Sequence, residues 1–352
     1  MISALIFIAV IGVLVLVHEY GHFIVAKKAG MKVEEFGFGF PPRLWGVKKG
    51  ETTYSINWIP FGGFVKIYGE DGEDRNAPRS FSSKPIGTRL KVIVAGVVMN
   101  FLLAAFLLML GNYIGIRVGI GDETDAISAS ARDKKVQILR VVENSPAQEA
   151  GLNIFDEIVG FETAQEVRDY IAANAGKEVQ LTIRRDSQTE VKEISIPERD
   201  EGEGLLGIVP ARTGLLSYPW YESLWRGLED AVFLTGQTAI GYYDLFKTLL
   251  LKGQLLADVS GPIGIANVTG QAAAVGFRFL LQFVALISVN LAVLNIIPFP
   301  ALDGGRALML IVEKFKGSPV NQKVEAAINS IGFALLILLM IYATVKDITR
   351  IF

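Results

Sequence analysis

A long apolar segment at the start of the chain limits what this sequence can fold into. From Ile2 to Val17 nearly every side chain is apolar, and Lys27 and Lys28 close the segment. About 20 residues, each rising about 1.5 Å along a helix, cross the ~30 Å hydrocarbon core of a bilayer. The sequence therefore predicts a membrane-spanning helix over roughly residues 2–26, with the two lysines at its C-terminal end.

Polar residues interrupt the last third of this segment as His18-Glu19-Tyr20-Gly21-His22, which reads His-Glu-x-x-His. Helical residues four positions apart share a face, so His18 and His22 can hold one metal ion, and Glu19 can accept a proton from a water at that metal. Ionisable groups in hydrocarbon are costly, which makes them functional candidates. These are also the only two histidines of the chain. The motif predicts a hydrolytic zinc site at membrane depth; the alternative is two unrelated histidines near a helix end.

The composition agrees with several membrane spans joined to a water-soluble part. The 352 residues are 51% hydrophobic, which is high for an ordinary soluble protein. The formal net charge is -2, so no nucleic-acid partner is implied. The chain has no cysteine, which excludes a disulfide framework, a cysteine nucleophile and a thiolate metal site.

Three further segments have the length and apolar character of spans, at roughly residues 92–114, 279–299 and 327–345. A fourth candidate, residues 219–276, begins as a helical pattern but is interrupted by charged and amide side chains. We expect it to lie at the membrane interface or against the helix bundle rather than to span. The prediction is a polytopic α-helical membrane protein with four transmembrane helices, a membrane-associated β-hairpin or sheet and an inserted α+β domain.

The loop at residues 28–91 is rich in basic residues and has strand character. From Lys27 to Lys91, counting both ends, the chain carries 12 Lys and Arg. The positive-inside rule places this loop in the cytoplasm, with the N-terminus outside and the metal motif toward the cytoplasmic face. Alternating aromatic and glycine residues over 36–40, which we expect Pro41-Pro42 to stop, precede β-formers over 52–67 and predict a small antiparallel sheet. Its aromatic residues either dip into the membrane beside the metal or belong to a plain cytosolic hairpin.

Residues 118–212 read as an extracytoplasmic soluble domain. Strands are expected at 136–142, 156–161, 179–184 and 191–196, and helices at 146–150 and 164–173. This order, with Ser-Pro-Ala-x-x-Ala-Gly-Leu followed by Asp-x-Ile, resembles a bacterial PDZ domain. Such domains add a peptide strand to a sheet edge. The resemblance implies that the loop Gly204-Leu205-Leu206-Gly207-Ile208 holds a peptide C-terminus, with Gly204, Leu206 and Gly207 as the candidates. The alternative is a PDZ-shaped gate that binds no peptide.

The end of the third span offers a third metal ligand. Pro298 and Pro300 break the helix there, so Asp303 lies in irregular backbone, which is tolerated at membrane depth where it lines a polar cavity. Four spans bring this end to the same side as His18 and His22, whereas a fifth span would place it about a membrane thickness away. Two imidazoles and one carboxylate leave one zinc position open for water. The alternative is an aspartate that caps a helix in a Pro-Gly turn.

With these motifs assembled, the chain resembles the RseP-type site-2 proteases, the intramembrane zinc metalloproteases of bacteria. The likeness covers almost the whole chain, and it rests on the following stretches: His-Glu-x-x-His, Gly-Phe-Gly-Phe, Pro-Phe-Gly-Gly-Phe-Val-Lys, Gly96 to Asn100, Ser-Gly-Pro-Ile-Gly and Asn-x-x-Pro-x-Pro-x-Leu-Asp-Gly-Gly. The resemblance implies one zinc ion at His18, His22 and Asp303, with Glu19 as general base. One departure is that RseP carries two tandem PDZ domains, whereas this chain has room for one.

The resemblance also implies a setting and substrates. The protein is expected to be a multi-pass protein of the bacterial cytoplasmic (inner) membrane that acts in regulated intramembrane proteolysis. Its expected substrates are single-span membrane proteins already trimmed outside, such as anti-sigma factors, or remnant signal peptides. Asn290 and Asn295 fall where the family handles substrate.

Other polar and glycine positions are candidates from the sequence itself. Asn100 in the second span either positions substrate or the metal helix, or joins helices through its amide. The glycines of the 36–40 stretch, Gly37 and Gly39, belong to a segment that could pair with an unwound substrate.

Two other classes of protein remain as alternatives. One is a non-catalytic PDZ scaffold in the membrane with a structural zinc, which normally fills all four positions with protein ligands. The other is an ion transporter, although no paired internal repeat is evident.

We divide the sequence into 1–27 (first span with the motif), 28–91 (cytoplasmic loop and sheet), 92–115 (second span), 118–212 (PDZ-like domain), 213–276 (amphipathic, interfacial helices), 277–306 (third span with the third ligand) and 307–352 (loop and fourth span).

Overall fold

The computed structural model describes residues 2–72, 74–121, 130–142, 144–185, 188–198, 206–252 and 261–351. It divides into two compact units. The helical unit comprises residues 1–110, 224–276 and 280–352, and the smaller sheet unit comprises residues 111–223 and 277–279.

Four described helices are long and apolar enough to cross a membrane, as the sequence predicts. They are α1 (Ile2–Lys28), α2 (Ile86–Ile114), α8 (Phe277–Ile296) and α10 (Gln322–Ile351). The predicted spans 2–26, 92–114 and 327–345 lie within α1, α2 and α10. The predicted span 279–299 extends three residues past the end of α8 at Ile296, because Pro298 lies in the turn that follows.

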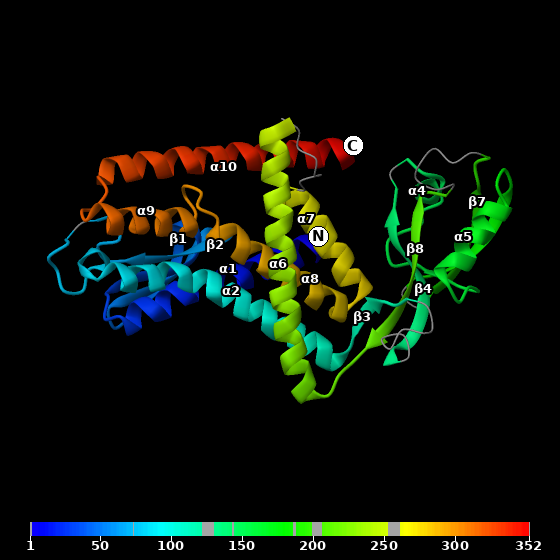
Figure 1. The fold of residues 1–352 in the computed structure, drawn as a ribbon, viewed down its shortest axis with the longest axis horizontal. Helices are drawn as coiled ribbons and strands as arrows, with labels where there is room; N and C mark the ends of the chain where they lie inside the picture. Colours follow the sequence, from blue (N-terminus) through cyan, green and yellow to red (C-terminus); the bar gives the residue numbers. More distant parts are fainter. Residues whose placement is uncertain are drawn as a thin grey trace. The chain divides into compact units, whose positions relative to one another are not determined.

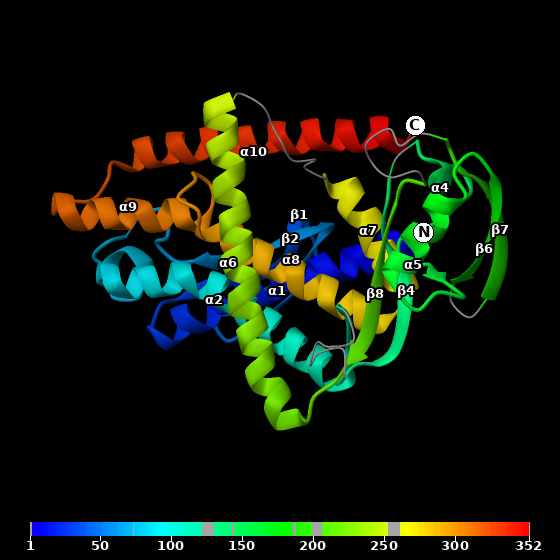
Figure 2. The same cartoon turned by 45° about the vertical axis from the view of Figure 1, so that its right-hand side comes forward.

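Three further helices of the helical unit are too polar or too short to count as spans. They are α6 (Trp220–Lys252), α7 (Pro262–Val275) and α9 (Asp303–Lys316). Ala231 of α6 is fully buried in a cluster with Ala104 of α2 and Ala285 of α8, and Figures 1 and 2 show α6 crossing these two helices. The turn at Gly261 starts α7, whose first N–H groups donate to the Asp347 carboxylate of α10.

The helices α1 and α2 approach each other closely in the helical unit. A Cβ added at Gly21 would lie 2.4 Å from the carbonyl oxygen of Ala95, so the backbones touch at this point. A buried cluster continues from this crossing and includes Ala26 of α1, Val92 of α2 and Leu310 of α9. Glycine at the contact is what allows the two helices to come this near.

The loop between α1 and α2 forms two long strands, β1 (Val33–Lys49) and β2 (Thr52–Ile67), followed by a short 3-10 helix at Phe81–Ser83. The sheet was predicted, but the expectation that Pro41-Pro42 stops the first strand is wrong. The register passes from the Phe40–Ile59 pair to the Arg43–Asn57 pair, so neither proline has a ladder partner. Proline lacks an N–H and is tolerated where the pairing is irregular or at an edge. The strand therefore continues across both prolines.

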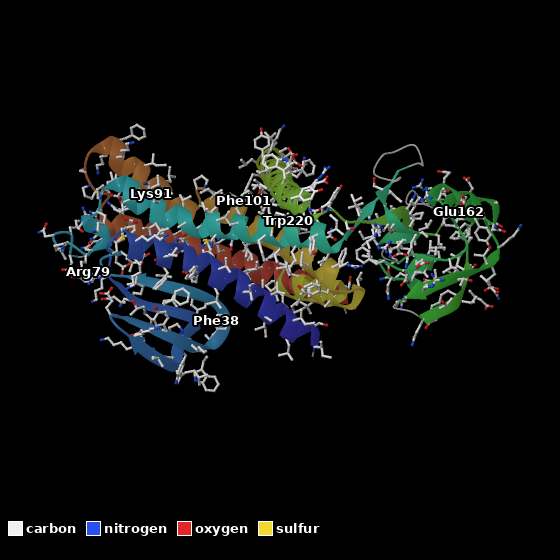
Figure 3. All side chains as sticks on the ribbon, turned by 90° about the horizontal axis from the view of Figure 1, so that it is seen from below. Phe38, Arg79, Lys91, Phe101, Glu162 and Trp220 are labelled. Atoms are coloured by element: carbon white, nitrogen blue, oxygen red, sulfur yellow. The ribbon has the colours of Figure 1, made fainter. Side chains whose placement is uncertain are left out.

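Both halves of β1 pair with β2, which widens this small sheet. Phe36 has a partner on each side, Tyr54 and Val65, and Tyr54 has Phe36 and Val47, so the first halves of β1 and β2 form the middle of the sheet. The sheet packs on α1, since a Cβ at Gly12 would lie 3.2 Å from the Phe38 ring. Figure 3 shows Phe38 on the sheet beside this helix.

The sheet unit contains a six-stranded antiparallel sheet in the order β3-β8-β4-β5-β6-β7. The strands are β3 (Ile116–Gly119), β4 (Arg132–Val141), β5 (Glu157–Ile158), β6 (Glu178–Arg185), β7 (Gln188–Ser195) and β8 (Ile208–Leu216). Two helices, α4 (Pro146–Glu149) and α5 (Ala164–Ala173), pack on it. The predicted elements of this region are present, and α5 has the predicted bounds, but the strand expected at 156–161 is reduced to the two residues of β5. Alternating apolar residues of β6, among them Val179, Leu181 and Ile183, form its core.

Candidate metal centre

Three side chains that the sequence singled out meet in the helical unit. His18 and His22 lie one turn apart on α1, with their Nε2 atoms 3.2 Å apart. Asp303 begins α9, and its Oδ2 lies 3.0 Å from His18 Nε2 and 3.3 Å from His22 Nε2. In the described part of the chain, these residues form the one group of three or more potential ligands able to hold a metal ion, with ligand atoms within 4.8 Å of one another.

The turn between α8 and α9 places Asp303 at this point. Pro298 and Pro300 cannot continue α8, so the helix ends and α9 begins afresh at Asp303. The expectation that Asp303 lies in irregular backbone is wrong, because the irregular segment ends at the preceding residue and Asp303 is the first helical residue. The next residue, Gly304, packs directly on the turn, since a Cβ there would lie 2.2 Å from the carbonyl oxygen of Ile297. A side chain at this position would push α9, and the carboxylate at its start, away from α1.

The residues present fit a zinc ion. Asp303 Oδ2 is buried and accepts no hydrogen bond, so its lone pairs are available to a cation. A Cβ added at Gly96 of α2 would lie 2.4 Å from His22 Nε2 and 2.8 Å from His18 Nε2, so both nitrogens face a space that only glycine leaves open. Two imidazole nitrogens and one carboxylate oxygen are the donors of an open zinc site.

Glu19 lies between this group and the sheet. It follows His18 on α1, and it is half-buried. A Cβ at Gly63 of β2 would lie 3.2 Å from Glu19 Cγ and 3.0 Å from Val15 Cγ1. The sheet therefore contacts α1 one residue from the first histidine, and a larger side chain at Gly63 would press on Glu19.

The second-span asparagine joins the cluster. Asn100 is 1% exposed, and its side-chain nitrogen lies 3.3 Å from His18 Nδ1. Among the described contacts, neither asparagine of α8 is a partner of the two histidines. Asn290 donates to the carbonyl of Leu286, and its oxygen lies 3.4 Å from the Tyr242 hydroxyl of α6, while Asn295 is half-buried in the last turn.

The glycine candidates occupy tight positions in the sheets. A Cβ at Gly37 would lie 2.5 Å from the Phe64 ring, and Gly39 has φ +79°. Gly207 has φ +73° and packs on Ser145 at the start of β8, next to the buried Leu206. Gly204 lies outside the described residues. Roles of these residues in binding stay predictions.

Sequence reasoning missed one contact of this centre entirely. His22 Nδ1 donates to the main-chain carbonyl of Val92 at 2.8 Å. Every residue has a main-chain carbonyl, so the sequence does not indicate which one accepts this hydrogen bond. Only the way the two helices pack identifies it. The spacing of Val92, Gly96 and Asn100, four residues apart along α2, is a signal that could have placed all three on the face toward α1.

Residues 6–339 match the family described as Peptidase family M50. A Clostridium perfringens relative, named provisionally as a zinc metalloprotease, is 38% identical over 342 aligned positions that cover 95% of each chain. The regulator of sigma-W protease RasP of Bacillus subtilis is 31% identical over 439 aligned positions, and the regulator of sigma E protease of Haemophilus influenzae is 30% identical over 440, each covering 98% of both chains.

The family match spans nearly the whole chain, and four described helices have the length and apolar character of membrane spans. The protein is therefore a multi-pass membrane protein. It belongs to peptidase family M50 and is a zinc metalloprotease of the site-2 protease type.

Proposed function

We propose that this protein hydrolyses peptide bonds within or near the transmembrane segments of single-span membrane proteins. The observation that carries the proposal is the meeting of His18 and His22, in the last part of the membrane helix α1, with Asp303, which follows the turn after the membrane helix α8. These three residues would hold one zinc ion. When bound, zinc supplies Lewis-acid polarisation and lowers the pKa of a coordinated water toward about 7.

Glu19 performs the proton transfers in this proposal. Its carboxylate accepts the proton of the attacking water and passes it to the nitrogen of the leaving amine. Its place on α1 supports the role, because it adjoins His18 and lies between that histidine and Gly63 of the sheet. The side chains of His18 and Asp303 are only 10% and 15% exposed, and limited contact with bulk water strengthens electrostatic interactions within the site.

The substrate segment pairs with β2 as an added strand. A transmembrane helix must unwind before hydrolysis, because its carbonyls are engaged in helical hydrogen bonds. In the pairing of the described residues, Gly63 to Lys66 have partners on one side only, all in β1. Their free side would satisfy the N–H and C=O groups of the unwound segment beside Glu19. Asn290 and Asn295 are the candidates for amide contacts to the same segment.

Exposed apolar side chains of the sheet support its contact with lipid. Large apolar side chains are exposed on it, including those of Trp45 and Trp58 at 59% and 64%. The others are Phe40, Leu44, Val47, Tyr54, Ile56 and Ile59. Exposed apolar side chains on this scale are typical of a surface that meets a membrane or a partner. The basic residues of the 28–91 loop support a position of this sheet at the cytoplasmic side of the bacterial inner membrane, with the N-terminus and the sheet unit outside.

The sheet unit is proposed to be a PDZ-like domain that either binds peptide C-termini or excludes untrimmed substrates. The start of β8, which follows Leu206 and Gly207, is the position that a carboxylate-binding loop would precede. Relatives named for sigma-W and sigma E regulation suggest substrates of the anti-sigma-factor type. Family membership favours this protease over a non-catalytic scaffold with structural zinc.

Replacing Glu19 with glutamine tests the proposal. The Glu19→Gln protein is expected to retain zinc and to lose cleavage of a tagged single-span substrate co-expressed with it, as measured by immunoblot and by metal analysis. Membrane proteins that accumulate in cells that express the inactive variant are candidates for the natural substrates. Cleavage by Glu19→Gln at a rate comparable to the native protein would refute the role of Glu19.

A further inference from the structure

The face of α2 toward α1 holds both histidines without offering a ligand of its own. His22 Nδ1 donates to the carbonyl of Val92, Gly96 leaves room at both Nε2 atoms, and Asn100 faces His18 Nδ1. These three residues follow one another at intervals of four and so lie on one stripe of α2.

The chemistry of a metal-bound imidazole fixes what each Nδ1 must do. The Nε2 atoms of His18 and His22 face Asp303 and each other, so Nε2 is the metal-binding atom in both. An imidazole that binds through Nε2 carries its proton on Nδ1 and needs an acceptor there. Val92 supplies a carbonyl to His22. The matching acceptor for His18 must come from the only polar group that the structure places at its Nδ1 within the described chain, the amide of Asn100.

The amide of Asn100 can present either of its atoms to His18. The structure places Nδ2 toward His18 Nδ1, and it leaves Oδ1 buried without a partner. Oxygen and nitrogen of an amide exchange places by a half-turn, and the hydrogen-bond partner decides between them. Because a metal-binding His18 presents an N–H at Nδ1, the oxygen of Asn100 must face it.

We propose that Asn100 is a positioning residue of the metal centre, whose side-chain oxygen accepts the Nδ1–H of His18 and so directs His18 Nε2 at the metal. This inference rests on the proposed zinc site. The bond fixes the tautomer and the ring orientation, and it raises the basicity of the ligand nitrogen.

Helix α8 holds Asn100 in this position. The hydroxyl of Ser288 donates to the carbonyl of Asn100 at 2.8 Å, and both residues are buried. A helical serine often bonds a carbonyl one turn back in its own helix, whereas this hydroxyl crosses to α2. The same helix α8 leads into the turn that presents Asp303. Support for His18 and placement of the carboxylate thus come from one rigid element.

Two other roles for Asn100 fit these contacts less well. A substrate contact requires access, and Asn100 is 1% exposed. If Asn100 served only to join helices, any polar group of a neighbouring helix could be its partner. Here its partner is the imidazole of His18, a candidate metal ligand.

The test compares Asn100→Leu, which has similar volume and no acceptor, with Asn100→Asp, which keeps the acceptor. Zinc affinity is measured on the full-length protein in detergent by competition with a chelator. Asn100→Leu is expected to bind zinc roughly 10- to 100-fold more weakly, because loss of an outer partner of a ligand has about that effect. Asn100→Asp is expected to stay within about threefold of the native protein, since carboxylates are common acceptors for metal-bound histidines.

Asn290→Leu is the matched control, since it removes an asparagine from α8 that has its own partners away from the histidines. Its zinc affinity is expected to equal that of the native protein, and the absorption spectrum of a Co²⁺-substituted protein is expected to change for Asn100→Leu alone. If Asn100→Leu does not fold in detergent, Asn100→Ala provides the comparison, with the same weakening expected.

Native zinc affinity in Asn100→Leu would overturn the inference. Equal weakening in Asn100→Leu and Asn100→Asp would also overturn it, because the acceptor would then not matter. Absence of zinc from the native protein would instead overturn the proposed function on which the inference rests.

Discussion

Replacing Gly96 with alanine tests the geometry of the metal centre with a single methyl group. The added Cβ would lie 2.4 Å from His22 Nε2 and 2.7 Å from His18 Cε1, well inside van der Waals contact. Neither ring can turn away freely, because Val92 and Asn100 hold the two Nδ1 atoms.

The alternative relief, moving α1 away from α2, is opposed elsewhere along the same crossing. The backbones already touch where Gly21 meets Ala95, and the buried cluster around Ala26 and Val92 extends from there. Overpacking of a well-packed interior typically costs about 1–3 kcal/mol. Alanine recovers roughly 0.5–1 kcal/mol over glycine in a helix, so the fold should survive.

If the ligand rings take up the strain, about 1–3 kcal/mol corresponds to a loss of roughly 5- to 150-fold in zinc affinity. The assay is zinc content after dialysis against a graded series of chelator concentrations, together with cleavage of the tagged substrate. Gly87→Ala on the same helix is the matched control, since nothing lies within 4 Å of a Cβ at that position. Native zinc affinity and cleavage in Gly96→Ala would refute this close approach of α1 and α2 at the histidines.

Three further predictions concern the site and its surroundings. Chelation of zinc should abolish substrate cleavage, and added Zn²⁺ should restore it in the native protein but not in Asp303→Ala; restoration in that variant would exclude the carboxylate as a ligand. Gly63→Val should lower the turnover number while zinc content stays native, because its side chain presses on Glu19; loss of zinc instead would place Gly63 in the metal centre. Hydrogen bonds from Arg79 and Lys27 lower the pKa of Glu51 from 4.5 to about 2. The stabilisation from Glu51 is therefore present above about pH 4.5 and is lost as the pH falls toward 2, so the difference in melting temperature between the native protein and Glu51→Gln should shrink over that range. A constant difference would show that the ion pair contributes nothing.

The apolar segments and the histidine spacing were enough to predict much of this molecule. Length and hydropathy alone locate the four candidate spans, and the helical period brings His18 and His22 onto one face. The number of spans then predicts that Asp303 shares their depth, and the structure places it about 3 Å from both nitrogens. These features were predictable because each follows from a local pattern or from counting membrane crossings.

Features that depend on how two segments meet were not predictable in this way. The pair Pro41-Pro42 reads as a strand terminator, yet β1 continues because its partner shifts register past both residues. Asn100 could be recognised as a polar residue in a span, but its sequence context could not tell a substrate contact from a contact with the metal helix. That distinction required the 3.3 Å approach to His18.

In a soluble metalloprotease, water can accept a hydrogen bond from a metal-binding imidazole. In a membrane metalloprotease, protein groups must do so. The Nδ1 atoms of both ligand imidazoles face α2 rather than solvent, and each unsatisfied polar group at membrane depth costs several kcal/mol. Both acceptors must therefore come from protein, and α2 provides them as the Val92 carbonyl and the Asn100 side chain. A helix can offer these groups to a neighbouring helix only if the two lie nearly in contact, which explains the glycines at Gly21 and Gly96. The His-Glu-x-x-His motif thus accounts for the ligands on α1, while the geometry of the site depends equally on a helix that contributes none.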